Sequence, residues 1–216
     1  MKKQIAVIGL GRFGISLIEE LTLLGYDVLA IDNDSEKVNS VVNTCTHAVQ
    51  ADAMDEQALK SLGIRNFDVV VVSIGENIQA NILAVIILQE LGVKKIVAKA
   101  RNNLHGKVLE KMGAGVIFPE RDMGKRLAHM LVSQNIMDHI ELSPHYSIME
   151  FRAPEIYIGK TLDQLGVRKM MGITILAIKR GEQIIVAPRA AQVIDRGDVL
   201  VAVGKNADLK KLYDME

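Results

Sequence analysis

The sequence has little of what marks disulfide-bonded, zinc-binding or nucleic-acid-binding proteins. One of its 216 residues is a cysteine, Cys45, which excludes a disulfide framework and a cysteine-based zinc site and fits a reducing compartment. Neither sign of charge is in excess, because 26 lysines and arginines balance 26 aspartates and glutamates. A surface that follows phosphates normally leaves a basic excess, so nucleic acid is not expected as the main partner.

Long hydrophobic runs are also missing. Residues 1–9 begin with a basic pair, but their apolar run of about five residues is shorter than the core of a signal peptide. The most apolar later stretch, residues 80–91, is interrupted by Asn81 and Gln89 and is too short to span a bilayer. Hydrophobic residues make up 49% of the sequence, which excludes a disordered chain. We therefore expect a soluble, cytoplasmic, folded protein.

The first 120 residues repeat one pattern, a short β-branched run followed by a turn and an amphipathic stretch. The runs predict strands at residues 4–8, 27–32, 46–50, 69–73, 96–99 and 115–118. The amphipathic stretches predict helices at residues 13–24, 35–42, 55–62, 77–91 and 103–112. Strands that alternate with helices at this spacing predict right-handed crossovers and a parallel sheet, an α/β fold of the Rossmann type.

The pattern changes after Pro119. Residues 122–140 are predicted to form one long helix, and from Glu141 onward apolar residues recur mostly at every second position. This period predicts strands at residues 147–152, 173–179, 183–187 and 199–203, with short helices near 161–165 and 206–212. We therefore predict a Rossmann nucleotide-binding domain with a crossover helix over residues 1–140 and a small α+β lobe over residues 141–216.

A glycine-rich motif, Gly9-Leu10-Gly11-Arg12-Phe13-Gly14, joins the first predicted strand to the first helix. Its three glycines permit a tight turn, close approach of the backbone to a pyrophosphate, and close packing of helix on strand. The second strand ends in Asp32, 18 residues after Gly14, where a carboxylate accepts both ribose hydroxyls and repels a 2′-phosphate. The motif therefore predicts an adenosine-containing ligand other than NADP; glycines that serve packing alone are the alternative.

The other candidate residues follow the strand ends, because ligands of parallel sheets lie beyond the carboxyl ends of the strands. Asp52 is predicted to accept a hydrogen bond from an adenine amino group, and Arg12 to bind phosphates as a bidentate donor. For most of the others a solvated loop is an equally good interpretation. The predicted nucleotide-binding set is Gly9, Gly11, Arg12, Phe13, Gly14, Asp32, Asn33, Asp52, Ala53, Ser73, Ile74, Gly75, Asn77, Lys99 and Arg101.

No catalytic residue is predicted. A dehydrogenase needs an acid or base beside the nicotinamide, but residues 141–216 contain one histidine, His145, with no evident partner. The five histidines of the chain have no metal-binding spacing, and no phosphate-binding loop with its lysine is present. We therefore expect a nucleotide effector and not a substrate, and hence no enzyme.

Four segments together resemble a known family: Ile8-Gly9-Leu10-Gly11-Arg12-Phe13-Gly14, Leu62-Gly63-Ile64-Arg65-Asn66-Phe67-Asp68, Gly75-Glu76-Asn77-Ile78-Gln79-Ala80 and Phe118-Pro119-Glu120-Arg121-Asp122-Met123-Gly124. They are similar to the cytosolic regulatory subunits of Ktr/Trk potassium uptake systems, which belong to the RCK class of regulators of potassium conductance. The resemblance covers essentially the whole chain. It implies a homodimer that assembles into an octameric ring beneath a membrane potassium channel subunit, at the inner face of the membrane.

The resemblance also implies ATP or ADP in the Rossmann cleft, with ATP favouring the conducting arrangement. Arg12 would contact phosphates, Asp32 the ribose, and Asp52 with Ala53 the adenine. Glu120 would lie near the γ-phosphate at the dimer contact with Mg²⁺ or Ca²⁺, because bare like charges would repel each other. The alternative is that Glu120 is simply a carboxylate favoured at a helix N-terminus.

In the second lobe, residues 162–168 are similar to the stretch where several family members bind cyclic di-AMP. The resemblance implies a phosphate contact from Arg168 and base contacts from three apolar residues, which are Leu162, Leu165 and Val167. The family's usual Arg-Ala-Lys-Tyr-Gly is Arg168-Lys169-Met170-Met171-Gly172 here, which lacks the aromatic residue. A plain contact between two lobes of a dimer is the alternative.

The hypothesis is therefore a regulatory subunit in which adenine-nucleotide binding rearranges a ring and thereby gates a potassium channel. One alternative is an NAD(H)-binding oxidoreductase, because the glycine motif does not by itself distinguish NAD(H) from ATP. The other is a redox-sensing NADH-binding regulator with no channel partner.

Overall fold

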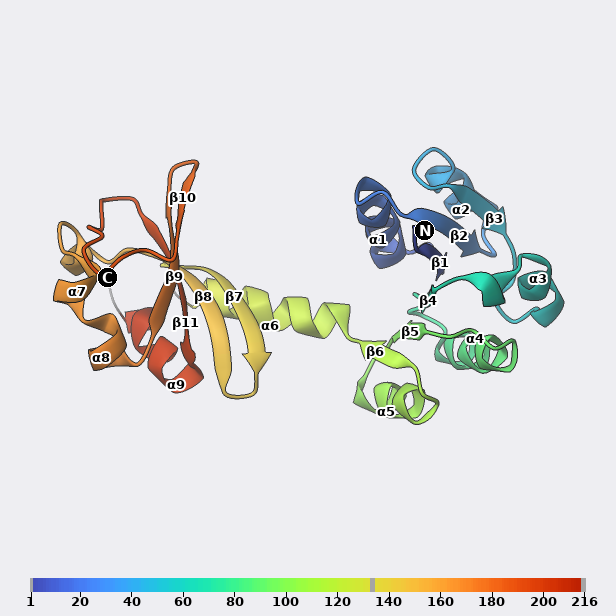
Figure 1. Cartoon of the computed structure of the whole chain (residues 1–216). Helices are drawn as coiled ribbons and strands as arrows, with labels where there is room; N and C mark the ends of the chain where they lie inside the picture. The colour runs from blue at the N-terminus through green and yellow to red at the C-terminus, as the bar shows by residue number, and fades with distance from the viewer. Residues whose placement is uncertain (1, 133–134, 215–216) are drawn as a thin grey trace. The chain divides into compact units, whose positions relative to one another are not determined.

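The computed structural model describes residues 2–132 and 135–214. The chain divides into two compact units, Met1–Pro119 and Glu120–Glu216, which Figure 1 draws. The boundary predicted near Ile140 falls inside a strand of the second unit, so the stretch from 120 to 140 belongs to that unit. Among the described residues, no helix combines the length and the apolar character needed to cross a membrane.

The first unit is a six-stranded parallel sheet of order β3-β2-β1-β4-β5-β6, which confirms the predicted fold class. Its elements follow one another as β1 (Gln4–Ile8), α1 (Arg12–Leu23), β2 (Asp27–Asp32), α2 (Ser35–Val41), β3 (His47–Gln50), α3 (Glu56–Ser61), the 3₁₀ helix η1 (Ile64–Asn66), β4 (Val69–Val72), α4 (Ile78–Glu90), β5 (Ile96–Lys99), α5 (Asn103–Lys111) and β6 (Gly115–Ile117).

Alternate residues of the central strands point into two separate cores, as the period of a strand requires. Val7 and Ala30 pack with Ile18 of α1 and with α2, whereas Ala6 and Ile31 lie in the core formed with α3, α4 and α5. Figure 1 shows α1 on one side of the sheet and α4 on the other. Both faces of the sheet are covered, which explains why the four valines of β4 form a continuous apolar run.

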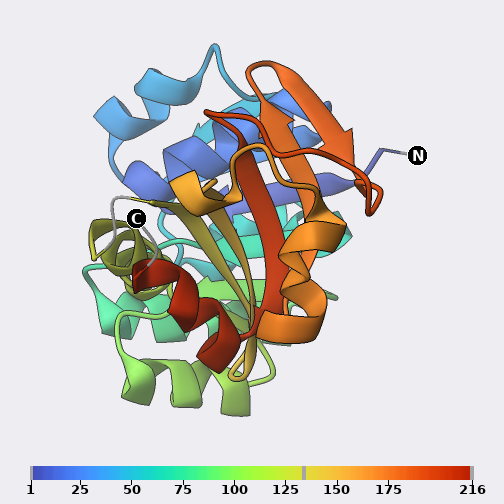
Figure 2. The ribbon, with the colours of Figure 1, turned by 90° about the vertical axis from the view of Figure 1, so that its left-hand side faces the viewer.

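The second unit is a five-stranded antiparallel sheet of order β10-β9-β11-β8-β7 with short helices. Helices α8 and α9 lie in front of its strands in Figure 2, and they contribute Val167 and Leu209 to the core of the unit. The elements are α6 (Pro119–Leu131), β7 (Ile136–Ser143), β8 (Tyr146–Arg152), η2 (Glu155–Tyr157), α7 (Leu162–Leu165), α8 (Val167–Met171), β9 (Thr174–Arg180), β10 (Gln183–Val186), β11 (Val199–Lys205), α9 (Asn206–Leu209) and η3 (Lys210–Asp214).

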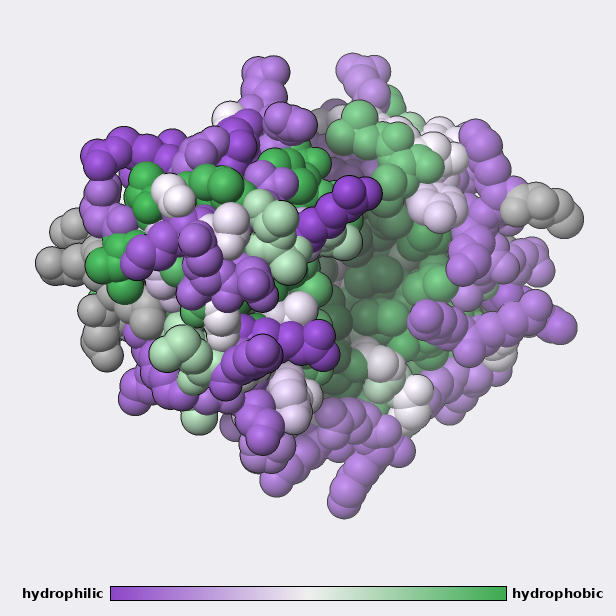
Figure 3. Space-filling view, turned by 60° about the vertical axis from the view of Figure 1, so that its left-hand side comes forward, coloured by the Kyte–Doolittle hydropathy of each residue, from purple (hydrophilic) through white to green (hydrophobic). Residues whose placement is uncertain are grey.

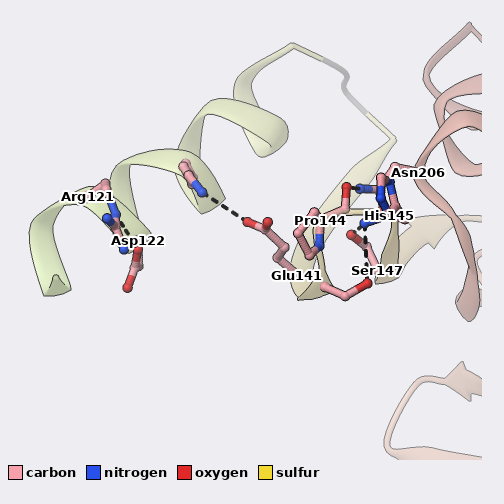
Figure 4. A network of polar contacts seen from close by, with 9 residues as sticks. Arg121, Asp122, Glu141, Pro144, His145, Ser147 and Asn206 are labelled. Carbon is pink, nitrogen blue, oxygen red and sulfur yellow. Dashed lines mark hydrogen bonds and ion pairs between the residues drawn. The ribbon is translucent and has the colours of Figure 1, made fainter. Parts of the chain in front are cut away.

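The long helix predicted for residues 122–140 is wrong in its second half. Helix α6 ends at Leu131, and β7 begins at Ile136. Strand β7 pairs antiparallel with β8, with Ile140 opposite Ile148, so tertiary pairing overrides the helical spacing of the apolar residues. The turn that joins the two strands is tied to α9, because Asn206 Nδ2 donates to the Pro144 carbonyl over 3.1 Å (Figure 4).

Helix α6 contacts its own sheet through charged side chains. Arg126 binds Asp138 of β7 with two hydrogen bonds of 2.6 Å, and this pair lowers the pKa of Asp138. Lys125 Nζ lies 3.1 Å from Glu141 Oε2, and Figure 4 shows Glu141 pointing from β7 toward α6. The helix therefore turns a polar face to the sheet that it packs beside.

Two histidines from different elements, His129 of α6 and His139 of β7, meet at the end of this contact. The rings of His129 and His139 stack with their centroids 3.8 Å apart, and His129 Nδ1 lies 2.5 Å from the Tyr213 hydroxyl. Burial and the neighbouring His129 lower the pKa of His139. No spacing of the histidines in the sequence predicts this cluster.

The apolar residues of α6 remain at the surface, and no residue of the helix is buried. Met123 is 57% exposed, Leu127 49% and Leu131 76%. They recur at helical spacing and form one stripe, which we call the apolar face of α6. On the side of the molecule drawn in Figure 3, hydrophobic residues are likewise exposed among hydrophilic ones.

A buried ion pair stabilises the second unit. Asp198 is fully buried and accepts two hydrogen bonds of 2.8 Å from Arg180 and one of 2.9 Å from the backbone N–H of Asp195. Burial alone would raise the pKa of Asp198, but these hydrogen bonds lower it below the ordinary value of 3.8. The contribution to stability is thus present above pH 3.8 and is lost as the pH falls through the lowered value.

We expect Arg180→Met to lower the free energy of unfolding of the second unit by about 3 kcal/mol at pH 7, because it leaves a buried carboxylate unpaired. The difference from wild type should shrink at pH 3, because without Arg180 burial raises the pKa of Asp198, so the variant's carboxyl is then protonated and no charge is left unpaired. Urea unfolding at both pH values measures it. The exposed pair of Arg196 with Glu155 supplies the control, since Arg196→Met should change stability by less than about 0.5 kcal/mol. Equal losses in both variants would contradict the prediction.

Candidate functional site

The candidate site lies where the strand order reverses. From β1 the chain continues to β2 and β3 on one side, and β4 to β6 lie on the other side of β1. Helices that leave neighbouring strands in opposite directions open a crevice at the carboxyl ends of β1 and β4, the place where ligands bind in such sheets. Gly9, Asp32, Ser73 and Lys99 all lie at this edge, because each ends or follows a strand of the sheet.

Two glycines of the motif are required by packing. Gly9 has a φ of +97°, and a Cβ atom at this residue would lie 2.9 Å from the Ile74 backbone nitrogen. A Cβ atom at Gly14 would lie 2.1 Å from the Gly9 carbonyl oxygen. The alternative interpretation, glycines that serve packing, therefore applies to these two residues whether or not a ligand binds.

Gly11 differs from the other two glycines. It is the N-cap of α1 with an ordinary φ of −77°, and a Cβ atom there would meet nothing within 4 Å. No side chain caps this helix and no acidic residue lies in its first turn, so no side-chain cap occupies the N–H groups of that turn. Arg12, the first residue of α1, is exposed beside them. Open N–H groups at a helix N-terminus favour an anion such as a phosphate.

Asp32 joins the glycine turn to the end of β2. It is 8% exposed, and its Oδ2 accepts a hydrogen bond of 2.6 Å from the backbone N–H of Leu10. Its Oδ1 accepts one of 2.9 Å from the N–H of Asp34, and Lys37 Nζ lies 3.9 Å away. A carboxylate has about four acceptor positions, so two remain for the hydroxyls of a ribose. Asn33, the next residue, is exposed.

The residues after β3 have different surroundings. Asp52 is exposed and accepts a hydrogen bond of 2.9 Å from the backbone N–H of Met54, which shapes the turn before α3. Ala53 is 7% exposed and belongs to the core beneath α3 and α4. Contact of either residue with an adenine stays a prediction.

The ends of β4 and β5 bring a cation to the glycine motif. Lys99 Nζ lies 3.2 Å from the position of a Cβ atom on Gly75 and 5.9 Å from the centre of the Phe13 ring. Ser73 is 5% exposed, and its Oγ lies 3.2 Å from the position of a Cβ atom on Gly14. Lys99, which follows the motif by more than 80 residues in the sequence, thus lies beside α1 at the opening of the crevice.

The remaining candidates of this edge shape its loops. Asn77 caps α4 by accepting a hydrogen bond of 2.9 Å from the backbone N–H of Ala80, and Ile74 packs against the core. Arg101 is exposed, and its Nη1 lies 3.4 Å from the Glu76 carbonyl oxygen. Two buried polar residues of this edge, Asn81 and His105, were not predicted, because no motif in the sequence marks them.

Other predicted residues lie in the second unit. Glu120 is exposed in the first turn of α6, where the helix dipole favours a carboxylate. No group of three or more histidine, cysteine, aspartate or glutamate side chains within residues 2–132 and 135–214 has the geometry of a metal site. One carboxylate does not form a divalent-cation site by itself, so the residues of a single chain do not fit the predicted Mg²⁺ or Ca²⁺.

The residues predicted for cyclic di-AMP do not all face solvent. Val167 is 6% exposed in the core of the second unit, and Leu162 and Leu165 pack against that core. Arg168 is exposed on α8. Only the arginine is therefore fully available to a ligand in one chain.

Comparison with known proteins gives matches over both units. The TrkA-N domain family matches residues 5–119, and the TrkA-C domain family matches residues 148–215. The chain is 50% identical to Ktr system potassium uptake protein C of Bacillus subtilis (strain 168) over 212 residues, 98% of this chain and 96% of that one. It is 47% identical to Ktr system potassium uptake protein A of the same organism over 210 residues, covering 97% and 95%. The solved GsuK RCK domain has the same fold, with a TM-score of 0.69, 18% identity, and coverage of 100% of this chain and 48% of that one.

The glycine geometry predicts opposite outcomes for two alanine variants. Gly14→Ala should lower the free energy of unfolding of the first unit by about 1–3 kcal/mol or more, because its Cβ atom has no space beside the Gly9 carbonyl. Gly11→Ala should change it by less than about 0.5 kcal/mol, because its Cβ atom points into open space. Thermal and urea unfolding check both; a strongly destabilised Gly11→Ala would refute the assignment of an open helix N-terminus.

Proposed function

Because the chain belongs to the RCK family of Ktr/Trk potassium uptake regulatory subunits, we propose that it senses adenine nucleotides and thereby gates a membrane potassium channel subunit. One observation carries the nucleotide part of the proposal. The uncapped N-terminus of α1 opens at the strand switch point, with Asp32 on one side and Lys99 on the other. A carboxylate for a ribose and cations for phosphates, on either side of open N–H groups, match the parts of an adenosine phosphate.

In this proposal the ligand lies along the edge of the sheet. The ribose hydroxyls bind the free acceptor positions of Asp32, the phosphates bind the N–H groups after Gly11, and the adenine extends toward Asp52. Arg12 and Lys99 neutralise the phosphate charge. A 2′-phosphate would lie against the Asp32 carboxylate, which disfavours NADP.

ATP or ADP is the proposed ligand, and NAD(H) is the alternative with the same adenosine half. GsuK, which has this fold at 18% identity, has been solved as a channel bound to NAD, and at 16% identity it has been solved bound to ADP. The fold therefore accommodates both kinds of ligand. An oxidoreductase or an NADH-binding redox regulator remains the second candidate for that reason, and a hydride-transfer assay with a panel of carbonyl compounds separates the enzyme from a binding protein.

Gating requires that the ligand bind two arrangements of the assembly with different affinity. The γ-phosphate is the proposed discriminator, because it is the group by which ATP differs from ADP. The proposed partner is a channel subunit of the Ktr/Trk type, with this protein at the cytoplasmic face of the membrane. Co-purification with such a subunit, or restored potassium uptake in a deficient strain, supports this part.

The apolar face of α6 supports a homodimer. Charged side chains of α6 form ion pairs with carboxylates of β7. The apolar residues Met123, Leu127 and Leu131 of the same helix remain exposed at helical spacing. An apolar stripe on a helix is stabilised by a second apolar stripe, and two copies of one chain supply identical stripes related by a two-fold axis. Assembly of such dimers into an octameric ring is the proposed form of the regulator.

Two further ligands stay predictions. A cation near Glu120 would need ligands beyond one chain, such as phosphate oxygens or a second copy, so no step of the proposed gating depends on it. Cyclic di-AMP would bind between two copies of the second unit with Arg168 as a phosphate donor, and the alternative for this surface is a plain dimer contact.

Isothermal titration calorimetry with ATP, ADP, NADH and adenosine tests the proposed function. Asp32→Ala should weaken all four ligands together, by about tenfold, because each loses the acceptor of its ribose hydroxyls. Asp34→Ala is the matched control, since Asp34 caps α2 by binding the N–H of Glu36 and should affect stability alone. Absence of heat with every ligand on folded wild-type protein would refute nucleotide sensing.

Sedimentation equilibrium tests the dimer. Leu127→Asp should raise the dissociation constant of the dimer by about tenfold or more, because it buries a charge in the apolar face of α6. Leu104→Asp is the control, since Leu104 is 74% exposed on α5 of the first unit. A Leu127→Asp variant that associates as strongly as wild type would remove α6 from the interface.

A further inference from the structure

Buried polar atoms without a partner concentrate on the β4 and β5 side of the crevice. In the described part of the chain these atoms are the Oγ atom of Ser73, the Oδ1 atom of Asn81 and the Nε2 atom of His105, with Thr22 Oγ1 elsewhere on α1. Leaving a buried polar atom unpaired costs free energy, so the presence of a polar residue at each of these positions calls for a structural explanation. For Asn81 and His105 the reason lies in the hydrogen bonds that their other atoms make.

Asn81 ties the end of β4 to the end of β5. It lies in the first turn of α4 and is fully buried. Its Nδ2 donates to the Ile74 carbonyl over 2.7 Å and to the Lys99 carbonyl over 3.2 Å. Both amide hydrogens are thereby used, and the reverse orientation would place Oδ1 against two carbonyl oxygens. One side chain therefore sets the separation of the two loops that border the crevice.

His105 holds the next residue of the same loop. It is 4% exposed, and its Nδ1 accepts a hydrogen bond of 3.2 Å from the backbone N–H of Arg101. Burial lowers the pKa of His105, which keeps the ring neutral and able to accept this bond. Asn102 caps α5 by binding the N–H of His105 over 2.9 Å. The backbone from Lys99 to Arg101 is thus fixed at both ends by buried polar side chains.

The consequence concerns the Lys99 ammonium group. A lysine side chain is flexible, so its reach into the crevice depends on where its backbone stands. With its carbonyl bound by Asn81, Lys99 extends over Gly75 toward Phe13, beside the open N-terminus of α1. Loss of the Asn81 amide would release the β5 end from the β4 end and move this cation relative to the N–H groups of α1.

We propose that Asn81 is a positioning residue for the phosphate half of the nucleotide site, acting through the carbonyls of Ile74 and Lys99. The inference rests on the proposed function. It predicts different effects on the two halves of the ligand. Asp32, the proposed partner of the ribose, lies on β2, on the other side of the switch point. Substitution of Asn81 should therefore affect the phosphates and spare the adenosine.

The test compares adenosine, ADP and ATP on full-length wild type and Asn81→Ala by calorimetry. We expect ADP and ATP to bind about tenfold more weakly to the variant, and adenosine to keep its affinity within about twofold. A merely structural role would instead weaken all three in the same proportion, or none of them while the melting temperature falls. Either of those results overturns the inference.

Three further variants keep the test decisive. Thr22→Val removes an unpartnered buried polar atom near the far end of α1, away from the crevice, and should leave all three affinities unchanged. Asn81→Ser retains a hydroxyl donor for one carbonyl, so it should fall between wild type and alanine and serves if the alanine variant does not fold. In a Lys99→Met background the Asn81 substitution should cause little further loss of ADP and ATP affinity, since both substitutions act through one cation. Losses of affinity that add in full in the double variant count against the inference.

The outcomes separate this inference from the proposed function. Wild-type protein that binds none of the three ligands refutes nucleotide sensing, and with it the role of Asn81. Wild-type protein that binds them normally, with Asn81→Ala losing adenosine as strongly as ATP, leaves the proposed function intact and refutes the positioning role alone.

Discussion

The close approach of α1 to the end of β1 is the constraint on which the first unit depends. Gly14 of the helix lies so near the Gly9 carbonyl that no side chain fits between them. This contact brings the first turn of α1 to the switch point of the sheet, where its N–H groups have no capping side chain. Asp32 then binds the N–H of Leu10 and fixes the turn from the side of β2. The crevice follows from these backbone contacts before any ligand is present.

The second unit is stabilised by an apolar core and a buried ion pair. Its core of apolar residues lies on the face of the sheet that α7, α8 and α9 cover, and the buried pair of Arg180 and Asp198 joins β9 to the segment before β11. Helix α6 contributes no buried residue to this core. Its contacts with β7 are ionic or aromatic, so its apolar residues remain available for association. The two sides of one helix thereby have separate roles, attachment within the chain and assembly between chains.

Much of the first unit could be predicted because its local signals agree. β-branched runs, amphipathic stretches and the glycine motif each indicate the same elements, and the predicted strand ends agree with the observed ones within a residue or so. Strand β7 was missed because the apolar residues on both sides of the break keep a helical spacing, and pairing with β8 is not a local property. Asn81 was missed for the same reason, since the Lys99 carbonyl that it binds belongs to another strand end, which only the fold brings near. His105 binds the N–H of Arg101, four residues before it, but no motif marks such a bond.

The ionic attachment of α6 has a consequence for how the protein responds to its surroundings. Dissolved salt shortens the range of attraction between charges, to about 8 Å at physiological ionic strength, and weakens exposed pairs such as Lys125 with Glu141 more than apolar packing. The two sides of α6 therefore differ in their dependence on ionic strength, because added salt weakens the attachment to β7 and leaves apolar contacts of the opposite face in place.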